Sequence, residues 1–185
     1  MFQRLFARRR NNASIAHTLY GAIVAQAREP ALYREFGVPD TLDGRFDMIV
    51  LHAFLFLNRM KTATEEQRQL GQAVFDAFLK DMDRNLREMG VSDIGVPKRL
   101  KKMAQAFYGR VGAYDSALAD PHPGALADAI ARNVFPGAEA DEAGAALASY
   151  ARTVAAALAN QPVEQFFAGR LEFPPPDRSG RQVAA

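Results

Sequence analysis

The sequence predicts an all-α fold, a single irregular bundle of helices around a buried central helix near residues 44–60. The central helix is predicted from the run FDMIVLHAFLFLNRM, in which His52 is the one residue between Met48 and Leu57 that is not plainly apolar. A helix that is apolar on every side is buried on every side. The run is about half the roughly 20 residues of a membrane span, which favours a protein core. Hairpin signals are absent, and every other segment long enough to assign has helical spacing.

Length and composition are those of one globular domain. The chain has 185 residues, of which 49% are hydrophobic and 24% are charged. It contains no Cys, which excludes disulfides and thiolate metal sites and is typical of a reducing compartment. Residues 1–110 hold 18 Lys and Arg against 12 Asp and Glu, a net of +6, whereas residues 111–185 hold 5 against 9, a net of −4. A polyanion or an anionic membrane should therefore meet the N-terminal part first.

The N-terminal segment, residues 1–12, places apolar and basic residues side by side. Its arginines follow the apolar residues, so it does not resemble a secretory signal, and a cytoplasmic location is expected. One interpretation is a weak anchor for an anionic membrane surface or for ribosomal RNA, and the other is a frayed, solvated start. The predicted contact residues are Phe2, Arg4, Phe6, Arg8, Arg9 and Arg10.

Residues 13–170 are expected to form the helical domain, whose first helix should begin at a cap. Ser14 or Asn12 can supply that cap, ahead of a modest apolar stripe. Pro30 suits the first position of a short helix, which Gly37 ends.

Capping signals mark the central helix and the helix after it. Asp43, or Thr41 as the alternative, can cap the central helix. Thr64 with Gln67 three residues later has the capping-box pattern, and Gly90 ends the helix that follows. That helix has one broad apolar stripe over more than five turns, with charge pairs four residues apart on its solvent side.

Another long helix is expected to start at Pro97, with apolar residues stepping by three and four as far as Leu118. Cations crowd its first turns, where they oppose the positive end of the helix dipole. The two interpretations of this cluster are a partner-binding surface and a solvated face. Its members are Lys98, Arg99, Lys101 and Lys102.

The C-terminal part is expected to hold two Ala-rich helices, the clearer one over residues 141–160, and a last short helix opened by Pro162. Residues 171–185 are expected to form a flexible, proline-containing tail, because the sequence FPPPDRSGRQVAA is too polar and too rich in proline to pack a core.

No catalytic or nucleotide-binding motif is present in the sequence, which lacks GxxxxGK[ST], GxSxG, HExxH and CxxC. His52 is interpreted as a core residue with one hydrogen bond, and a heme ligand is the alternative. Three carboxylates within two turns, Asp76, Asp81 and Asp83, are interpreted as an ion-paired solvent face rather than a metal site, because Asp81 lies well round the helix from the other two. We therefore expect no enzymatic activity, no metal and no cofactor.

Three stretches in this order resemble one known family. They are YREFGVPDTLDGRFDMIVLHAFLFLNRM, FDAFLKDMDRNLREMGVSD and KKMAQAFYGRVGAYDSAL, residues 33–60, 75–93 and 101–118. The shared motifs are the Pro39-Asp40-Thr41 turn, the apolar helix closed by Arg59-Met60, the segment Asp81…Arg87-x-Met89-Gly90-Val91, and Phe107-Tyr108…Tyr114-Asp115. Together they resemble the ubiquinol–cytochrome c chaperone family, the assembly factors for ubiquinol–cytochrome c reductase, over roughly residues 14–160.

The resemblance implies an all-helical, non-enzymatic chaperone that binds newly made cytochrome b and holds it for heme insertion and complex assembly. Mitochondrial members of the family work with a small partner chaperone, dock near the ribosomal exit and carry N-terminal targeting sequence that this chain lacks. That difference suits a bacterial protein that acts from the cytoplasm, either free or peripheral at the inner face of the plasma membrane. It leaves the partner chaperone and the ribosome contact open.

An apolar membrane client needs a soluble surface to bind it, such as a groove between helices with an aromatic floor and a charged rim. The floor is predicted at Phe75, Phe107, Tyr108 and Tyr114. The rim is predicted at Asp81, Arg84, Arg87, Lys98, Lys101 and Lys102.

Two other functions stay open from the sequence. One is an RNA-binding, ribosome-surface or membrane-peripheral helical protein, which would use the arginine-rich start and the lysine cluster and would lose affinity steeply with salt. The other is a helical enzyme that depends on metal or heme at His52 or at the helix with Asp76 and Asp83. That enzyme would carry metal or heme when purified.

Overall fold

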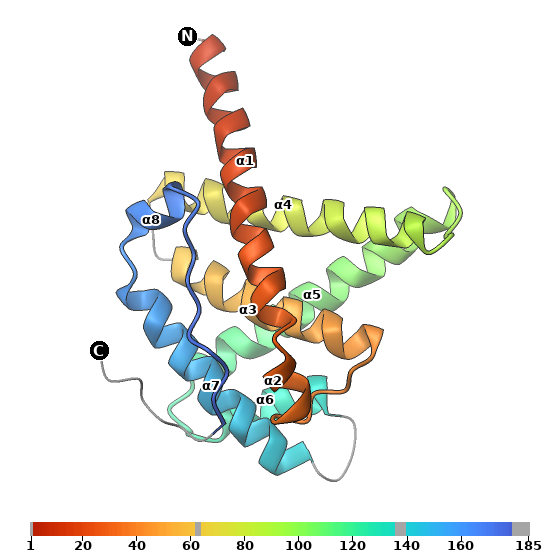
Figure 1. Ribbon diagram of the computed structural model, residues 1–185, viewed down its shortest axis with the longest axis vertical. Helices are drawn as coiled ribbons and strands as arrows, with labels where there is room; N and C mark the ends of the chain where they lie inside the picture. Colours follow the sequence, from red (N-terminus) through yellow and green to blue (C-terminus); the bar gives the residue numbers. More distant parts are fainter. Residues whose placement is uncertain (1, 62–63, 136–139, 179–185) are drawn as a thin grey trace.

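Eight helices and no strand make up the part of the chain that the computed structural model describes, residues 2–61, 64–135 and 140–178 (Figure 1). The helices are α1 (Phe2–Ala27), α2 (Pro30–Arg34), α3 (Leu42–Lys61), α4 (Glu65–Glu88), α5 (Gly95–Ala119), α6 (Ala125–Val134), α7 (Ala140–Asn160) and α8 (Val163–Phe167). The predicted all-α bundle is therefore confirmed. No helix in these ranges combines the length and apolarity that crossing a bilayer requires.

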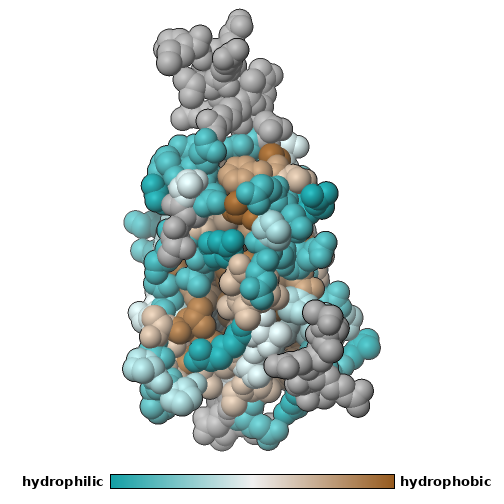
Figure 2. Space-filling view, turned by 90° about the vertical axis from the view of Figure 1, so that its left-hand side faces the viewer, coloured by the Kyte–Doolittle hydropathy of each residue, from teal (hydrophilic) through white to brown (hydrophobic). Residues whose placement is uncertain are grey.

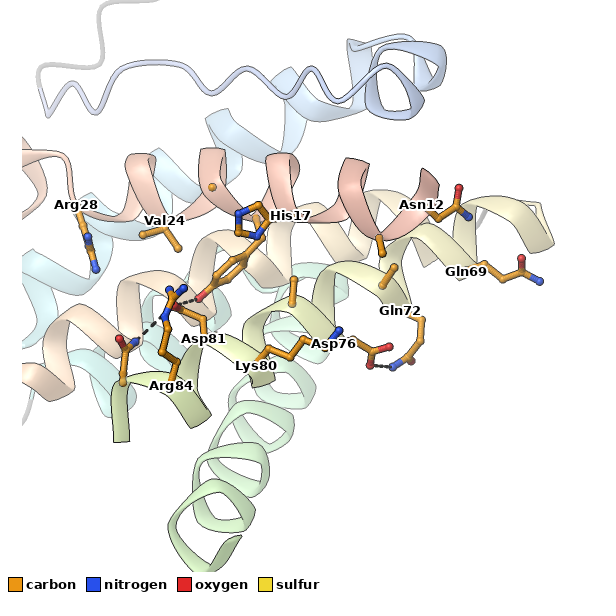
Figure 3. A pocket seen from close by; sticks show the side chains of 16 residues that line it. Asn12, His17, Val24, Arg28, Gln69, Gln72, Asp76, Lys80, Asp81 and Arg84 are labelled. Atoms are coloured by element: carbon orange, nitrogen blue, oxygen red, sulfur yellow. Dashed lines mark hydrogen bonds and ion pairs between the residues drawn. The ribbon is translucent and has the colours of Figure 1, made fainter. Parts of the chain in front are cut away.

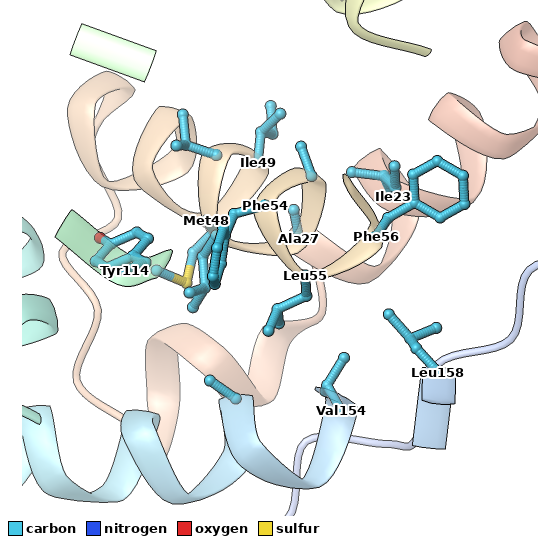
Figure 4. Packing of buried hydrophobic residues seen from close by; sticks show 14 of the residues in the cluster. Ile23, Ala27, Met48, Ile49, Phe54, Leu55, Phe56, Tyr114, Val154 and Leu158 are labelled. Carbon is cyan, nitrogen blue, oxygen red and sulfur yellow. The ribbon is translucent and has the colours of Figure 1, made fainter. Parts of the chain in front are cut away.

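Helix α3 is the centre of the bundle and packs against α1, α4, α5, α6 and α7. Every residue from Asp47 to Phe56 is buried, as the apolar run predicts. Figure 4 shows side chains from α1, α5 and α7 converging on this helix, among them Ile23, Tyr114 and Val154. Each large apolar side chain buried in this way stabilises the fold by about 1.5–3 kcal/mol.

The turn before α3 explains why a glycine follows the Pro-Asp-Thr motif. Thr41 Oγ1 accepts a hydrogen bond from the Gly44 backbone N–H at 3.1 Å, so Thr41 is the cap and Asp43 lies inside the helix. A Cβ at Gly44 would lie 2.0 Å from the carbonyl oxygen of Pro39. The chain can therefore pass this close to itself only where residue 44 has no side chain.

The signals at both ends of α4 are also confirmed, whereas α5 begins earlier than predicted. Thr64 and Gln67 form the reciprocal capping box, with the Thr64 backbone N–H donating to the Gln67 side chain at 2.9 Å. Gly90 has a φ of +79°, the left-handed conformation that ends a helix. Helix α5 begins at Gly95, two residues before Pro97, which is tolerated because the first turn leaves backbone N–H groups unpaired anyway.

The expected start of the first helix is wrong. Helix α1 runs unbroken from Phe2, so neither Asn12 nor Ser14 is an N-cap. The residues before Asn12 are mostly Arg, Leu, Ala and Gln, which favour helix, and none of them is Gly or Pro. The N-terminal end of α1 extends beyond the remainder of the bundle (Figure 1).

The segment after α8 is extended, but the expectation that it cannot pack a core is wrong for its first part. Leu171 is buried, and Phe173 packs edge-on against His52 with ring centroids 5.6 Å apart. Arg178 donates to the Glu142 side chain at 2.7 Å, which ties the segment to α7. Residues 179–185 lie outside the described residues.

Figure 2 shows the side of the molecule that carries α8, where apolar side chains form separate patches among hydrophilic ones.

His52 is one of two buried polar side chains in α3, and a chain of hydrogen bonds satisfies it. Its Nδ1 lies 2.7 Å from the Met48 carbonyl oxygen and its Nε2 lies 2.8 Å from the Tyr150 hydroxyl. The Gln26 side-chain amide donates to the same hydroxyl at 2.7 Å and to the Pro174 carbonyl at 2.9 Å. A carbonyl only accepts, so His52 carries its proton on Nδ1 and Tyr150 donates to Nε2. The chain links α1, α3, α7 and the C-terminal segment.

An ion pair is buried one turn earlier in α3. Arg110 Nε of α5 lies 2.7 Å from Asp47 Oδ1, but the contact lacks hydrogen-bond geometry. Burial raises the pKa of the Asp47 carboxyl to about 6, although the Arg110 charge opposes the shift. Burial lowers the pKa of His52 to about 4, so the imidazole is neutral at pH 7.

We expect Tyr150→Phe to lower the free energy of unfolding by about 1–3 kcal/mol, because it leaves His52 Nε2 buried without a donor. Urea unfolding measures the change. Tyr108→Phe is the matched control, since that ring is 59% exposed, and it should change stability by less than about 0.5 kcal/mol. Equal losses in the two variants would contradict the role assigned to the hydrogen-bond chain.

We expect His52 and Asp47 to affect acid stability with opposite signs. The unfolded chain protonates His52 near pH 6.5 and the folded protein near pH 4, so the unfolding free energy falls as pH drops through this window. Asp47, whose pKa is raised, binds its proton more tightly when folded and so offsets part of the loss. Urea unfolding from pH 7 to pH 4 should give a flatter profile for His52→Gln and a steeper one for Asp47→Asn. Wild-type slopes in both variants would contradict the assignment.

Candidate functional site

The candidate site is a groove between α1 and α4, with a volume of about 980 Å³ (Figure 3). Residues 12–28 of α1 and residues 69–85 of α4 provide its two walls. At a rise of about 1.5 Å per residue, the groove is about 24 Å long. That length fits a helix of about 16 residues or an extended segment of about seven, so the shape suits a polypeptide better than a small molecule.

The walls of the groove combine small residues with polar and charged ones. Ala13 and Gly21 on α1 and Ala73 and Ala77 on α4 leave the space between the helices open. No atom lies within 4 Å of a Cβ placed at Gly21, so a side chain at this position would extend into open space. A backbone can approach closely where the wall consists of such small side chains.

Asp81 joins the two walls at one end of the groove. Its carboxylate accepts a hydrogen bond from the Tyr20 hydroxyl at 3.0 Å and pairs with Arg84 on its own helix. The Asp81 side chain is only 13% exposed, and burial next to this carboxylate raises the pKa of Tyr20. The prediction that Asp81 lies on a solvent face is therefore wrong, because the residue faces α1.

Two cations line the groove without a carboxylate partner among the described residues. They are Arg28 at the end near Asp81 and Lys80 on the α4 wall. Asp76, farther along α4, accepts a hydrogen bond from Gln72 at 2.9 Å (Figure 3). The groove therefore offers both free charges and apolar surface to a bound segment.

The structure brings three of the four aromatic residues predicted as a client-binding floor into one cluster, namely Phe75, Phe107 and Tyr108. Phe107 and Tyr114 are fully buried in the core, so they do not form the floor of an open groove. Phe75 is buried between α4 and α5, with Tyr108 covering it at a centroid distance of 5.2 Å. Tyr108 alone is largely exposed. Tyr114 lies apart from the other three and packs against Phe54 of α3.

The predicted rim residues lie in three places. Asp81 and Arg84 line the α1–α4 groove. Arg87 lies near the end of α4, where it pairs with Asp83 at 2.8 Å. The other three, Lys98, Lys101 and Lys102, are exposed on the first turns of α5 and do not line the groove.

The side chains of the predicted N-terminal contact residues lie outside the described residues. They are those of Phe2, Arg4, Phe6, Arg8, Arg9 and Arg10.

Sequence reasoning missed most of the groove. Tyr20, Gly21 and Arg28 lie on α1, and Lys80 lies on α4, but no motif connects the two helices in the sequence. The one usable signal is the helical spacing of Asp76, Lys80 and Arg84 on one face of α4. Which helix covers that face depends on tertiary packing.

Neither metal nor heme has an evident binding site in the described part of the chain. No cluster of three His, Asp or Glu side chains there could hold a metal ion. Both ring nitrogens of His52 already have hydrogen-bond partners, and the residue is fully buried.

Comparison with known proteins assigns the family. The sequence model of the ubiquinol-cytochrome C chaperone family matches residues 34–173. The chain belongs to this family.

The "ubiquinol-cytochrome-c reductase complex assembly factor 1" of Xenopus laevis is 22% identical over 117 residues, which cover 63% of this chain and 58% of that protein. The protein of the same name from Mus musculus is 26% identical over 118 residues, which cover 63% of this chain and 39% of that protein. The chain thus spans less than two thirds of the length of these relatives.

A solved structure resembles this chain over nearly its whole length. The crystal structure of the Cbp3 homolog from Brucella abortus is 41% identical, with a TM-score of 0.82, over 97% of this chain and 99% of that chain. The family match begins at residue 34, after α1, so it includes the α4 wall of the groove but not the α1 wall. The structural match covers 97% of this chain, so it must include most of α1.

In this family member we expect Asp81→Ala to loosen α1 from α4, because it leaves the buried Tyr20 hydroxyl without an acceptor. The loss in unfolding free energy should be about 1–3 kcal/mol. Hydrogen exchange should also become faster in residues 15–25. Asp76→Ala is the matched control on the same helix and should have little effect, since Asp76 is exposed. Unchanged exchange in Asp81→Ala would contradict the proposed link.

Proposed function

We propose that this protein is a non-enzymatic chaperone that holds a segment of newly made cytochrome b during assembly of ubiquinol–cytochrome c reductase. The observation that carries the proposal is the α1–α4 groove, which is elongated and has open space at Gly21. Family membership supports the assembly role.

The chemistry of the groove supports a polypeptide client. Cytochrome b is an apolar membrane protein whose loops and helix ends carry apolar, polar and charged groups together. A wall of small residues with Arg28, Lys80 and Asp76 at its edges can pair with such a segment without burying a charge alone. A purely apolar groove would bind a transmembrane helix more tightly but would leave its polar ends unsatisfied.

The residues that line the groove include no Ser, Thr or Cys nucleophile. The buried titratable groups Asp47 and His52 belong to the core and do not line it.

The client can be identified by photo-crosslinking in cells, with the probe at Lys80 inside the groove and at Ser116 on α5 outside it. Newly made cytochrome b bound to the Lys80 probe, and not to the Ser116 probe, is the expected result. Recovery of cytochrome b only from a probe at Tyr108 would move the client to the α4–α5 face. Recovery of ribosomal RNA and ribosomal proteins alone would favour the ribosome-surface alternative and overturn the proposal.

Blocking the groove should reduce client binding without unfolding the protein. Gly21→Gln adds a long side chain where nothing lies within 4 Å, so the fold should tolerate it. We expect the Lys80 crosslink to cytochrome b to fall at least about tenfold, the effect of losing about 1.4 kcal/mol of binding. Gly112→Gln is the matched control, because it also replaces a helical glycine with open space around it but lies on α5. Equal crosslinking in both variants would place the client elsewhere.

A further inference from the structure

The connection between α4 and α5, together with the first turns of α5, forms a protruding end of the molecule (Figure 1). We call residues 89–102 the α4–α5 tip. Four large apolar side chains are strongly exposed among the described residues, and two of them belong to the tip, Met89 at 58% and Ile94 at 92%. Ile94 is the N-cap residue of α5, but its side chain makes no capping hydrogen bond. The start of the helix therefore does not explain why an apolar side chain is exposed here.

The tip is also strongly basic. It contains one carboxylate, Asp93, which is paired with Arg87 at 2.5 Å. Its cations have no ion-pair partner among the described residues. They are Lys98, Arg99, Lys101 and Lys102.

The fold does not account for these cations. They lie in the first turns of α5, where the helix dipole is positive and opposes them. Side chains on a helix lean toward its N-terminus, so the lysines of α5 lean toward the end that carries Ile94 and Met89. The tip therefore presents apolar and basic groups at one protruding end of the molecule.

We propose that the α4–α5 tip docks on an anionic membrane surface. Ile94 and Met89 would enter the boundary between headgroups and acyl chains, and the four cations would contact lipid phosphates. A protruding end that combines exposed apolar side chains with cations suits a deformable lipid surface, whereas a protein partner would need a pocket shaped to receive it. The proposal does not depend on the identity of the client, and it involves none of residues 1–12.

Docking at the tip would keep the groove close to the membrane. The α4 wall of the groove ends at Asn85, four residues before Met89, which corresponds to about 6 Å along the helix. A segment that leaves the bilayer could therefore reach the groove of a docked molecule.

Sedimentation with lipid vesicles tests the charge requirement on the 185-residue chain. Vesicles of phosphatidylcholine containing phosphatidylglycerol should bind the protein, and vesicles of phosphatidylcholine alone should bind it weakly. Replacing Lys98, Lys101 and Lys102 with Gln should lower partitioning about fivefold for each cation, roughly a hundredfold in all. The matched control replaces three exposed arginines elsewhere, Arg34, Arg132 and Arg170, with Gln and should retain binding.

A fluorescence measurement tests insertion, because the chain has no Trp of its own. Ile94→Trp introduces one Trp, so the Trp fluorescence reports on residue 94 alone. When anionic vesicles are added, its emission should shift to the blue and should be quenched by brominated lipid. Leu42→Trp is the matched control, since Leu42 is 71% exposed on another part of the molecule, and its emission should not change.

Two outcomes would overturn the proposal. One is unchanged Ile94→Trp emission with anionic vesicles. The other is binding that survives the loss of the three lysines but disappears when Arg8, Arg9 and Arg10 are replaced with Gln, which would assign membrane contact to the N-terminal segment. Client crosslinking at Lys80 is measured separately, so failure of the tip proposal and failure of the chaperone proposal are distinguishable.

Discussion

The structure depends on burying α3 on all sides while satisfying the one polar side chain in its centre. Five helices surround α3, and apolar packing alone would tolerate several registers between them, since apolar contacts are not directional. The hydrogen-bond chain from Met48 through His52 and Tyr150 to Gln26 is directional. A shift of α7 by one turn would leave His52 Nε2 buried without a donor, at a cost of about 1–3 kcal/mol. His52 therefore selects one arrangement of helices around an otherwise uniform helix.

Local features of this fold could be predicted from the sequence because they depend on neighbouring residues. The apolar run predicts α3, Thr64 and Gln67 predict the start of α4, and Gly90 predicts its end. The start of α1 was missed because Ser14 is a possible cap, but no residue before it breaks the helix. The packing of Phe173 was missed because composition describes a tail only on average, whereas a single aromatic ring can fill a gap beside His52.

The candidate site could be predicted only in part, because it depends on which helices meet. Phe107 and Tyr114 are aromatic, as residues of binding surfaces often are. Both lie on the side of α5 that faces the neighbouring helices, so they are buried in the core. The charge pattern of α4 identifies a polar face, but the same pattern fits solvent, an ion-pair network or a groove. The hydrogen bond from the Tyr20 hydroxyl shows that Asp81 faces the groove, and these two residues are 61 positions apart in the chain.

In the proposed function, moderate affinity in the groove would be an advantage, because an assembly chaperone must release its client. Arg28 and Lys80 at its edges remain partly solvated, so their attraction for a bound segment is weakened by water and salt. Small wall residues bury little apolar area themselves, which limits the hydrophobic contribution to that of the client side chains. A segment held in this way would dissociate once its native partners in the membrane offered a drier and more apolar interface. The mixed lining of the groove therefore fits transient binding better than permanent assembly.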